Sequence, residues 1–476
     1  MAKKFYITTT LPYVNADPHI GFALEIIQAD VVSRFYRKNG FEVFFNTGTD
    51  EHGLKIFQGA KKENIDIQKY CDFYAEKNKK LKYALNLSYN NFVRTTDEHH
   101  VKSAQDFWKR CQKNGDIYKK NYKIKYCVGC ELEKTESELV NGKCPIHPDR
   151  EVEIIEEENY FFKYSKYQKE LLNFYQKNKN FVVPESRFNE IKEFTKRGLE
   201  DFSISRLKEK MPWGVEVPND KNHVMYVWFD ALVNYISALE WPENAKKFKQ
   251  FWPGMQVAGK DNLRQQSSMW QAMLSSAGLP NSKQIFIHGF INVNGQKMSK
   301  SLGNVVDPFE LVKKYGADAV RYYLLREIPS TEDGDFTIEK FEQRYNGDLA
   351  SGIGNLVSRV VKMAEKFEDN KLKIKNKNLI LEIKKTKKEC ERAVEEFKFN
   401  ESLKIIWELV SWCDKYINQE KPWENKENSE QVVSDLIFAL ENIAELLEVF
   451  LPETSEKIKK TIKEKKSAVL FPRITG

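Results

Sequence analysis

Four side chains of the kinds that bind zinc lie within one short stretch of the sequence: Cys127, Cys130, Cys144 and His147. A Cys-x-x-Cys pair and a Cys-x-x-His pair, separated by a spacer, supply three thiolates and one imidazole, which make a closed tetrahedral ligand set for Zn²⁺. Gly129 and Gly142 are expected to permit the tight turns. Because a closed set leaves no position for a catalytic water, the pattern predicts a structural zinc ion. The alternative, four unrelated residues, fits this spacing poorly.

A second candidate site is the segment Asp17-Pro18-His19-Ile20-Gly21, which opens the first predicted helix. The unpaired N–H groups and the positive dipole end of a helix start suit a phosphate group. His19 would add a donor, and Gly21 would let a ligand approach the backbone. Taken alone, the segment is better explained as a capped surface helix with an incidental histidine.

The third candidate is a lysine-rich loop, Lys297-Met298-Ser299-Lys300-Ser301. Two lysines three residues apart, with hydroxyl groups between them, suit a mobile clamp for triphosphate oxygens. A solvated basic loop is the alternative, and most runs of lysine and serine are of that kind.

The elements that must hold these residues are indicated by hydrophobic periodicity. Strands are predicted at 4–8 and 41–45, and a helix between them whose apolar residues recur from Ile20 to Phe35. Residues 118–158 are charged and contain cysteines, which indicates an insertion. Strand–helix alternation resumes near Met225, with strands expected at 251–258 and 284–289 and a helix from Asp261 to just before Gly278. From Asp307 onward the pattern is almost entirely helical, so we expect an α/β domain followed by a helical domain.

Composition limits the class of protein. The chain has 476 residues, 41% hydrophobic and 13% aromatic, which excludes disorder and indicates about two to four domains. Seven cysteines, an odd number, argue against a disulfide framework. The formal charge of +7 permits a polyanionic partner without requiring one. There is no signal-peptide pattern and no run of ~20 apolar residues, so we expect a cytoplasmic protein without membrane association.

Together, His19-Ile20-Gly21 and Lys297–Ser301 resemble the HIGH and KMSKS motifs of class I aminoacyl-tRNA synthetases. Within that class, further segments resemble the methionyl-tRNA synthetase family, and the resemblance covers essentially the whole chain. These segments are Leu11-Pro12-Tyr13-Val14-Asn15, Gly48-Thr49-Asp50-Glu51-His52-Gly53, Tyr226-Val227-Trp228-Phe229-Asp230-Ala231 and Gly259-Lys260-Asp261. The predicted zinc knuckle also lies where that family carries one.

The resemblance implies an α/β fold, with a Rossmann-like parallel-sheet catalytic domain interrupted by a zinc-bearing connective insertion and followed by an α-helical anticodon-binding domain. The expected boundaries are 1–117 and 225–320 for the two catalytic halves, 118–224 for the insertion, 321–345 for a stem-contact region and 346–476 for the helical domain. It also implies ATP-dependent activation of methionine and transfer of the methionyl group to tRNA(Met), initiator and elongator. ATP with Mg²⁺ would be a substrate and one Zn²⁺ structural. The extra C-terminal module of some relatives is missing, so a monomer is expected.

Residue roles are implied by match to the family's motifs. His19, Gly21, Lys297, Ser299 and Lys300 would bind ATP, and all but Ser299 would also be catalytic, the lysines holding charge on the leaving pyrophosphate. Asp50 would anchor the methionine ammonium, and the rest of the pocket would be Leu11, Tyr13, Trp228, Ala231, Tyr235 and Gln266. Aromatic rings suit a polarizable sulfur, although Trp228 and Tyr235, seven apart on one helical face, would otherwise be read as core.

In the helical domain, Asn355 and Arg359 are four residues apart, hence on one helix face, and match the family's anticodon readers. Trp423 matches an aromatic on which an anticodon base stacks. The simpler interpretation is a surface polar pair and a buried tryptophan.

Three positions depart from the family pattern. Phe22 stands where a second histidine of the HIGH motif is usual, Gln266 where a pocket histidine is common, and Asn262 where an aliphatic residue is common. The exact outline of the methionine pocket is therefore open, whereas activity is still expected, because glutamine can donate and accept hydrogen bonds.

Two rival functions remain. A class I synthetase for an aliphatic amino acid or cysteine is disfavoured by the missing large editing insertion and by the closed zinc set. A synthetase-like protein that binds RNA without aminoacylating it is disfavoured by the intact Lys297–Ser301 segment, Asp50 and Trp228, since a binding protein has no need of an ATP clamp.

Overall fold

The structure is a computed structural model that describes residues 3–130, 132–134, 138–299, 302–367, 374–424 and 426–474. Lys300 and Ser301 of the lysine-rich loop lie outside the described residues. The chain divides into two compact units. The first contains Met1–Asp17, Glu42–Lys79 and Tyr89–Ile287, and the second contains Pro18–Phe41, Lys80–Ser88 and His288–Gly476.

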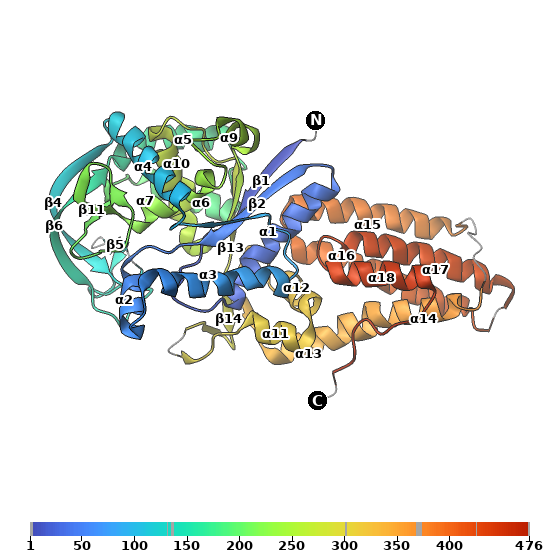
Figure 1. Cartoon of the computed structure of the whole chain (residues 1–476). Helices are drawn as coiled ribbons and strands as arrows, with labels where there is room; N and C mark the ends of the chain where they lie inside the picture. The colour runs from blue at the N-terminus through green and yellow to red at the C-terminus, as the bar shows by residue number, and fades with distance from the viewer. Residues whose placement is uncertain are drawn as a thin grey trace. The chain divides into compact units, whose positions relative to one another are not determined.

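A six-stranded sheet forms the centre of the first unit, with the strand order β3-β2-β1-β12-β13-β7. The pairs β1–β2, β1–β12, β2–β3 and β13–β7 are parallel. The strands are β1 (Lys4–Thr8), β2 (Glu42–Thr49), β3 (Asn91–Arg94), β7 (Val182–Val183), β12 (Met255–Gly259) and β13 (Gln284–His288). Of these, β1, β2 and β13 are labelled in Figure 1. The predicted parallel α/β sheet is confirmed.

Helices pack on this sheet around an aromatic core that includes Tyr6, Phe107, Trp108, Phe162 and Trp270. Phe107 and Trp270 stack with their ring centroids 5.4 Å apart. The helices of this unit are α2 (Leu54–Glu63), α4 (Glu98–Lys113), α5 (Gln168–Lys177), α6 (Glu185–Lys196), α7 (Val227–Ala231), α8 (Asn234–Ser237), α9 (Ala245–Phe251) and α10 (Trp270–Ser276), while α3 (Ile67–Ala84) begins in this unit and ends in the other.

The predicted insertion contains a long antiparallel ribbon. β4 (Ile117–Cys127) pairs with β6 (Glu153–Phe162), and β5 (Leu132–Lys134) and β8 (Phe202–Ser203) flank them. A smaller sheet is formed by β9 (Ser205–Leu207), β10 (Glu216–Val217) and β11 (Asp220–Met225). The same stretch also supplies β7, which joins the edge of the central sheet.

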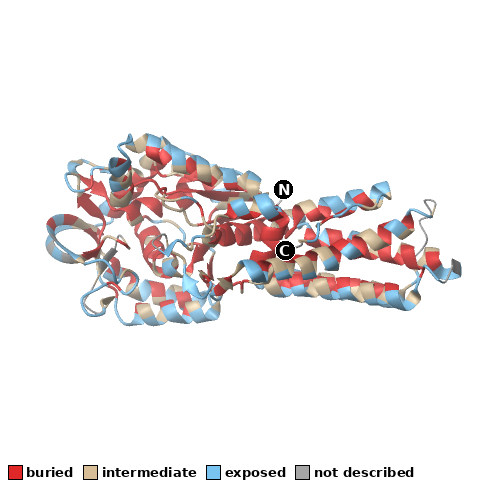
Figure 2. Cartoon of the chain, turned by 90° about the horizontal axis from the view of Figure 1, so that it is seen from below, coloured by how far each residue is buried: buried red, intermediate tan, exposed pale blue. Residues whose placement is uncertain are grey.

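The second unit begins with α1 (Ile20–Lys38). It continues with the short strands β14 (Ile291–Val293), β15 (Gln296–Lys297) and β16 (Gly334–Phe336) and with α11 (Pro308–Tyr315), α12 (Ala317–Arg326) and α13 (Ile338–Arg344). After a π-helical segment, Tyr345–Gly354, come the long helices α14 (Asn355–Ala364), α15 (Lys377–Glu395), α16 (Phe399–Glu420), α17 (Lys426–Leu447) and α18 (Pro452–Glu464). The long helices carry buried residues along one side and exposed residues along the other (Figure 2), as the predicted amphipathic stripe requires.

A buried ion pair ties α1 to α12. The Asp30 carboxylate lies 2.8 Å from the Arg321 guanidinium, and neither side chain is exposed. Arg34 and Ser88 also donate to Asp30, and Arg321 donates to the backbone oxygen of Phe450. Because a buried charge is tolerated only when it is paired and hydrogen-bonded, this network fixes α1, and with it the His19–Gly21 segment, within the second unit.

The structure differs from the predicted elements in several places; β2, for example, runs to Thr49, beyond the strand predicted at 41–45. Phe251 is the last residue of a helix, and the strand predicted from 251 begins only at Met255. Pro253 lies between them and has no N–H to donate to a neighbouring strand. Trp228 and Tyr235 lie on two short helices rather than one face of a single helix. The almost entirely helical region contains β16, which pairs in parallel with β14. Among the described residues, no helix is both long and apolar enough to cross a membrane.

Candidate active site

The His19–Gly21 segment forms the start of α1. His19 is the N-cap residue, and its Nδ1 accepts a hydrogen bond from the Gly21 N–H at 3.1 Å. An accepting Nδ1 places the imidazole proton on Nε2, which can donate to a ligand oxygen. A Cβ built on Gly21 would lie 2.9 Å from the His19 ring, so a larger residue would displace the imidazole. Glycine is therefore required at position 21 because the His19 ring lies too close for a Cβ, and not because the backbone has a positive φ.

The lysine-rich loop lies beside this helix start within the second unit. Met298 Cε is 3.4 Å from the position of a Cβ on Gly21, and the Ile20 N–H donates to the Val306 oxygen at 3.1 Å. Asn304 shapes the loop, since it accepts from the Ser299 N–H at 2.8 Å and donates to the Lys297 oxygen at 3.2 Å. Two segments almost 280 residues apart in sequence are thus brought together, with Lys297 exposed.

A buried ion pair next to the loop holds the same helix. His288, at the end of β13, lies with its Nε2 2.9 Å from Glu25 Oε2, and both side chains are 5% exposed. Its Nδ1 is 2.7 Å from the Gly289 oxygen. β14, which leads into the lysine-rich loop, begins two residues after Gly289. The His288–Glu25 pair therefore fixes α1 relative to the strand that precedes this loop.

The residues predicted to bind methionine all lie in the first unit. Beyond β1 the chain continues alongside the end of β2, where Tyr13 and Asp50 form a parallel bridge. The Val14 N–H donates to the Asp50 oxygen at 3.2 Å, and the Asp50 N–H donates to the Pro12 oxygen at 3.0 Å. Asp50 is 3% exposed, so its carboxylate is held in a largely dehydrated position. Leu11 is in the same segment and is partly buried.

A second group of these residues meets on the helices after β11 and β12. Gln266 Nε2 donates to the Tyr235 hydroxyl at 2.7 Å, and Tyr6 donates to the Tyr235 backbone oxygen at 2.9 Å. Gln266 thus makes a polar contact that a histidine could also make. Trp228 and Ala231 lie on α7, and the buried Nε1 of Trp228 has no hydrogen-bond partner within the described protein. A buried donor without a partner is costly, so the position of Trp228 needs a specific explanation.

A buried cluster that was not predicted from the sequence lies between these groups. Asp230 Oδ2 is 2.6 Å from His52 Nδ1, and Asp230 Oδ1 is 2.9 Å from His100 Nε2. His100 Nδ1 is 2.8 Å from the Ser237 hydroxyl. His52 and Asp230 each belong to a segment that resembles the family, which was the one indication in the sequence. Nothing in their spacing indicated that the two side chains meet.

The four predicted zinc ligands converge at the end of β4. Their ligand atoms all lie within 4.8 Å of one another, with Cys130 Sγ 3.4 Å from Cys144 Sγ and 3.2 Å from His147 Nδ1. Zn–S bonds of about 2.3 Å and Zn–N bonds of about 2.0 Å place tetrahedral ligand atoms roughly 3.5–3.8 Å apart, so the cluster could hold zinc.

The glycines of this cluster serve different purposes. Gly142 has φ +76°, as a tight turn requires. Gly129 does not have a positive φ; instead, a Cβ there would lie 2.4 Å from the His147 ring, so the ring itself excludes a larger residue. The cluster is attached to the rest of the first unit where Lys55 donates to the Gly129 oxygen at 2.5 Å.

The predicted anticodon-binding residues lie together in the second unit. Asn355 and Arg359 share α14, and the Arg359 guanidinium is 5.8 Å from the centre of the Trp423 ring. Arg359 also donates to Asn418 at 2.9 Å and lies 3.6 Å from Asp414, both on α16. Trp423 is 50% exposed, so the simpler interpretation of a buried core tryptophan is wrong.

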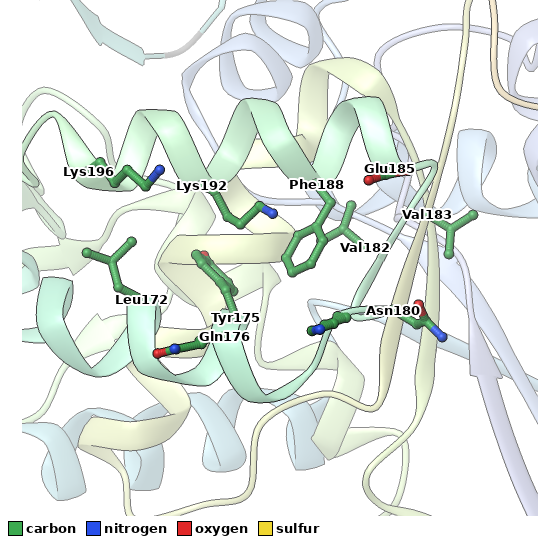
Figure 3. A pocket seen from close by; sticks show the side chains of 11 residues that line it. Leu172, Tyr175, Gln176, Asn180, Val182, Val183, Glu185, Phe188, Lys192 and Lys196 are labelled. Atoms are coloured by element: carbon green, nitrogen blue, oxygen red, sulfur yellow. The ribbon is translucent and has the colours of Figure 1, made fainter.

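A cavity of about 750 Å³ lies elsewhere, between α5, β7 and α6 (Figure 3). Tyr175 and Phe188 contribute apolar surface, and Lys192 extends over the Phe188 ring at 4.5 Å. None of the residues predicted to bind ATP, methionine, zinc or tRNA lines this cavity.

A parallel α/β sheet, a helix start beside a lysine-bearing loop, and a bundle of long helices are together the features of a class I aminoacyl-tRNA synthetase. Two sequence families match: "tRNA synthetases class I (M)" at residues 5–152 and 134–361, and "Anticodon-binding domain of tRNA ligase" at residues 376–474. The chain belongs to the methionine–tRNA ligase family of this class, whose members are ligases.

The similarity extends over nearly the whole chain. The methionine–tRNA ligase of Thermotoga maritima is 42% identical over 96% of this chain and 74% of its own length. That of Thermosynechococcus vestitus is 43% identical over 96% of this chain and 90% of its own length. Among solved structures, Mycobacterium tuberculosis methionyl-tRNA synthetase in complex with methionyl-adenylate matches with a TM-score of 0.92 at 34% identity, covering 100% of this chain and 99% of that one. Its apo form matches with a TM-score of 0.84.

Proposed function

We propose that this chain activates methionine with ATP and then transfers the methionyl group to the 3′ end of tRNA(Met), both initiator and elongator. In the first step, a methionine carboxylate oxygen attacks the α-phosphorus of ATP, and the bond to the bridging oxygen breaks as pyrophosphate leaves. In the second, a ribose hydroxyl of the tRNA takes the acyl group and AMP leaves. The observation that supports the proposal is the proximity of the His19–Gly21 helix start to the Lys297–Ser299 segment, since Met298 Cε lies 3.4 Å from the position of a Cβ on Gly21.

The protein's contribution to activation is positioning and charge stabilisation. His19 Nε2 donates to a phosphate oxygen of ATP, which enters with Mg²⁺, and the missing Cβ of Gly21 lets the nucleotide approach the backbone. Lys297, Lys300 and Ser299 hold the charge that develops on pyrophosphate. Asp50 pairs with the methionine ammonium, and the thioether lies among Leu11, Tyr13, Trp228, Ala231, Tyr235 and Gln266.

Replacement of Gly21 by alanine tests the helix start. Because the new Cβ would meet the His19 ring at 2.9 Å, the imidazole must rotate and lose its cap bond. We expect kcat/KM for ATP to fall by about tenfold, since misplacement of one contact group by about 1 Å has effects of that size or larger, while KM for methionine stays within twofold. Gly347→Ala is the matched control, because a Cβ there meets nothing within 4 Å. Equal ATP kinetics in both variants would contradict the assignment.

We propose that Cys127, Cys130, Cys144 and His147 hold one structural Zn²⁺. When bound, the ion supplies folding energy to the knuckle and no chemistry. Metal analysis of protein purified without chelator is expected to give one zinc per chain, and chelation should increase proteolysis between 127 and 147 while ATP binding persists. Protein without zinc that resists proteolysis equally well would contradict the assignment.

Other features remain predictions. The insertion at 118–224, the stem-contact region at 321–345 and the helical domain from 346 are proposed as the functional divisions of the chain. A cytoplasmic location follows from the proposed role in supplying methionyl-tRNA for translation. Light scattering of the purified protein would test the expected monomer.

A further inference from the structure

Asp230 is a buried carboxylate held by two imidazoles. It is fully buried, as is His100, and His52 is 6% exposed. Burial acts to raise the pKa of Asp230, but the charge of His52 and the hydrogen bonds from both histidines lower it to about 2. Asp230 is therefore an anion at every working pH, and a buried anion is tolerated only because both of its oxygens are bonded.

The hydrogen bonds assign the tautomers. A carboxylate only accepts, so His52 donates from Nδ1 and His100 donates from Nε2. The remaining nitrogen of His100, Nδ1, then accepts from the Ser237 hydroxyl in the neutral form of the ring. Bonds from an N–H to an ionised acceptor are about twice as strong as neutral ones, so this arrangement is stiff.

The cluster joins the two elements that carry the proposed methionine-binding residues. His52 stands two residues after Asp50, beyond the end of β2, and Asp230 stands two residues after Trp228 on α7. Glu51, between Asp50 and His52, is fixed independently by Arg94 at 2.7 Å, and its backbone oxygen accepts from Trp213 Nε1 at 2.5 Å. The His52–Asp230 hydrogen bond thus joins the segment that carries Asp50 directly to α7, the helix that carries Trp228.

We propose that Asp230 is a positioning residue for methionine, which through His52 fixes the distance between the ammonium-binding carboxylate of Asp50 and the thioether-binding ring of Trp228. His100 orients Asp230 for this role. In this proposal both histidines act through Asp230 and are assigned no contact with the substrate. The inference rests on the proposed function, because it uses the roles assigned there to Asp50 and Trp228.

Asp230→Asn tests the link with little change in shape. A carboxamide offers one accepting oxygen and presents an N–H to the second imidazole, so that ring must change tautomer, and both bonds lose the charge of the acceptor. We expect KM for methionine in pyrophosphate exchange to rise about tenfold, the scale of one charge-assisted hydrogen bond, while KM for ATP stays within twofold. If Asp230 only stabilised the fold, its replacement would raise KM for both methionine and ATP, or would lower the melting temperature without changing either KM.

His52 provides a second test that does not depend on the folding of the Asp230 variant. His52→Asn keeps an N–H donor close to the position of Nδ1 and should recover most of the methionine affinity that His52→Ala loses. Inhibition by 4-(methylthio)butanoate, which lacks the ammonium group, should weaken much less than methionine binding in His52→Ala. This difference is expected because His52→Ala disturbs the orientation of Asp50, which is proposed to bind the ammonium group that the analogue lacks.

The control is His223, which forms a comparable buried pair with Asp220 at 3.0 Å on β11. His223→Ala should lower the melting temperature as His52→Ala does, without changing KM for methionine. The inference is overturned if His52→Asn is no better than His52→Ala, or if the His223 variant shows the same rise in KM. If the unmodified protein does not activate methionine at all, the proposed function itself fails, which is a different result.

Discussion

Lys300→Ala is expected to lower the rate of methionine activation by ~10²–10³, the usual effect of removing one group that stabilises charge in the transition state. Lys300 itself lies outside the described residues, but its neighbours Met298 and Ser299 are fixed against Gly21 and Asn304. The described part of the lysine-rich loop therefore lies beside the helix start that we propose binds phosphate. Methionine affinity should change little, because the lysine acts on phosphate oxygens.

The measurement is ATP–pyrophosphate exchange at saturating methionine, with methionine binding followed separately by calorimetry. Lys313→Ala is a suitable control, since Lys313 is an exposed lysine on α11 of the same unit. Near-normal exchange in Lys300→Ala would remove this residue from the mechanism. A loss of equal size in Lys313→Ala would show that general positive charge, and not the lysine-rich loop, is responsible.

Trp423→Ala and Arg359→Ala are each expected to lower the rate of tRNA charging strongly while leaving methionyl-adenylate formation unchanged. The loss of a base-stacking ring costs ~1–3 kcal/mol, which corresponds to roughly one to two powers of ten in charging at limiting tRNA. Trp423 is half exposed and lies against the Arg359 guanidinium, so a base could stack on its free face. Raising the tRNA concentration should recover part of the loss.

Trp412→Ala is the matched control for the ring. Trp412 is a partly exposed tryptophan on α16 that stacks on Tyr416 with ring centroids 5.3 Å apart, and it lies outside the Arg359 cluster. Its removal should leave charging within twofold. If adenylate formation without tRNA falls as far as charging does in Trp423→Ala, then Trp423 serves stability and not recognition.

Much of the fold was predictable because its signals are local. The apolar residues from Ile20 to Phe35 define α1, and the spacing of Cys127, Cys130, Cys144 and His147 is contained within one short segment, so both were found from the sequence. The start of β12 was misplaced because the segment from Phe251 to Ala258, predicted as one strand, does not itself show where proline breaks it.

What could not be predicted depends on contacts between distant segments. Asp230 is 178 residues from His52 and 130 from His100, and no local pattern indicates that these three side chains meet. The same holds for the Asp30–Arg321 pair that fixes α1. In contrast, the approach of Met298 to Gly21 is equally long-range, but family resemblance linked the two motifs before their geometry was known.

The most direct test of the central claim is ATP–pyrophosphate exchange by the unmodified protein across a panel of all twenty amino acids. We expect exchange with methionine to exceed that with every other amino acid, including leucine, isoleucine, valine and cysteine, and to require no tRNA. Exchange that favours another amino acid would assign the site to a different synthetase. Absence of exchange with any amino acid, in protein that still binds tRNA, would show an RNA-binding protein and contradict the account.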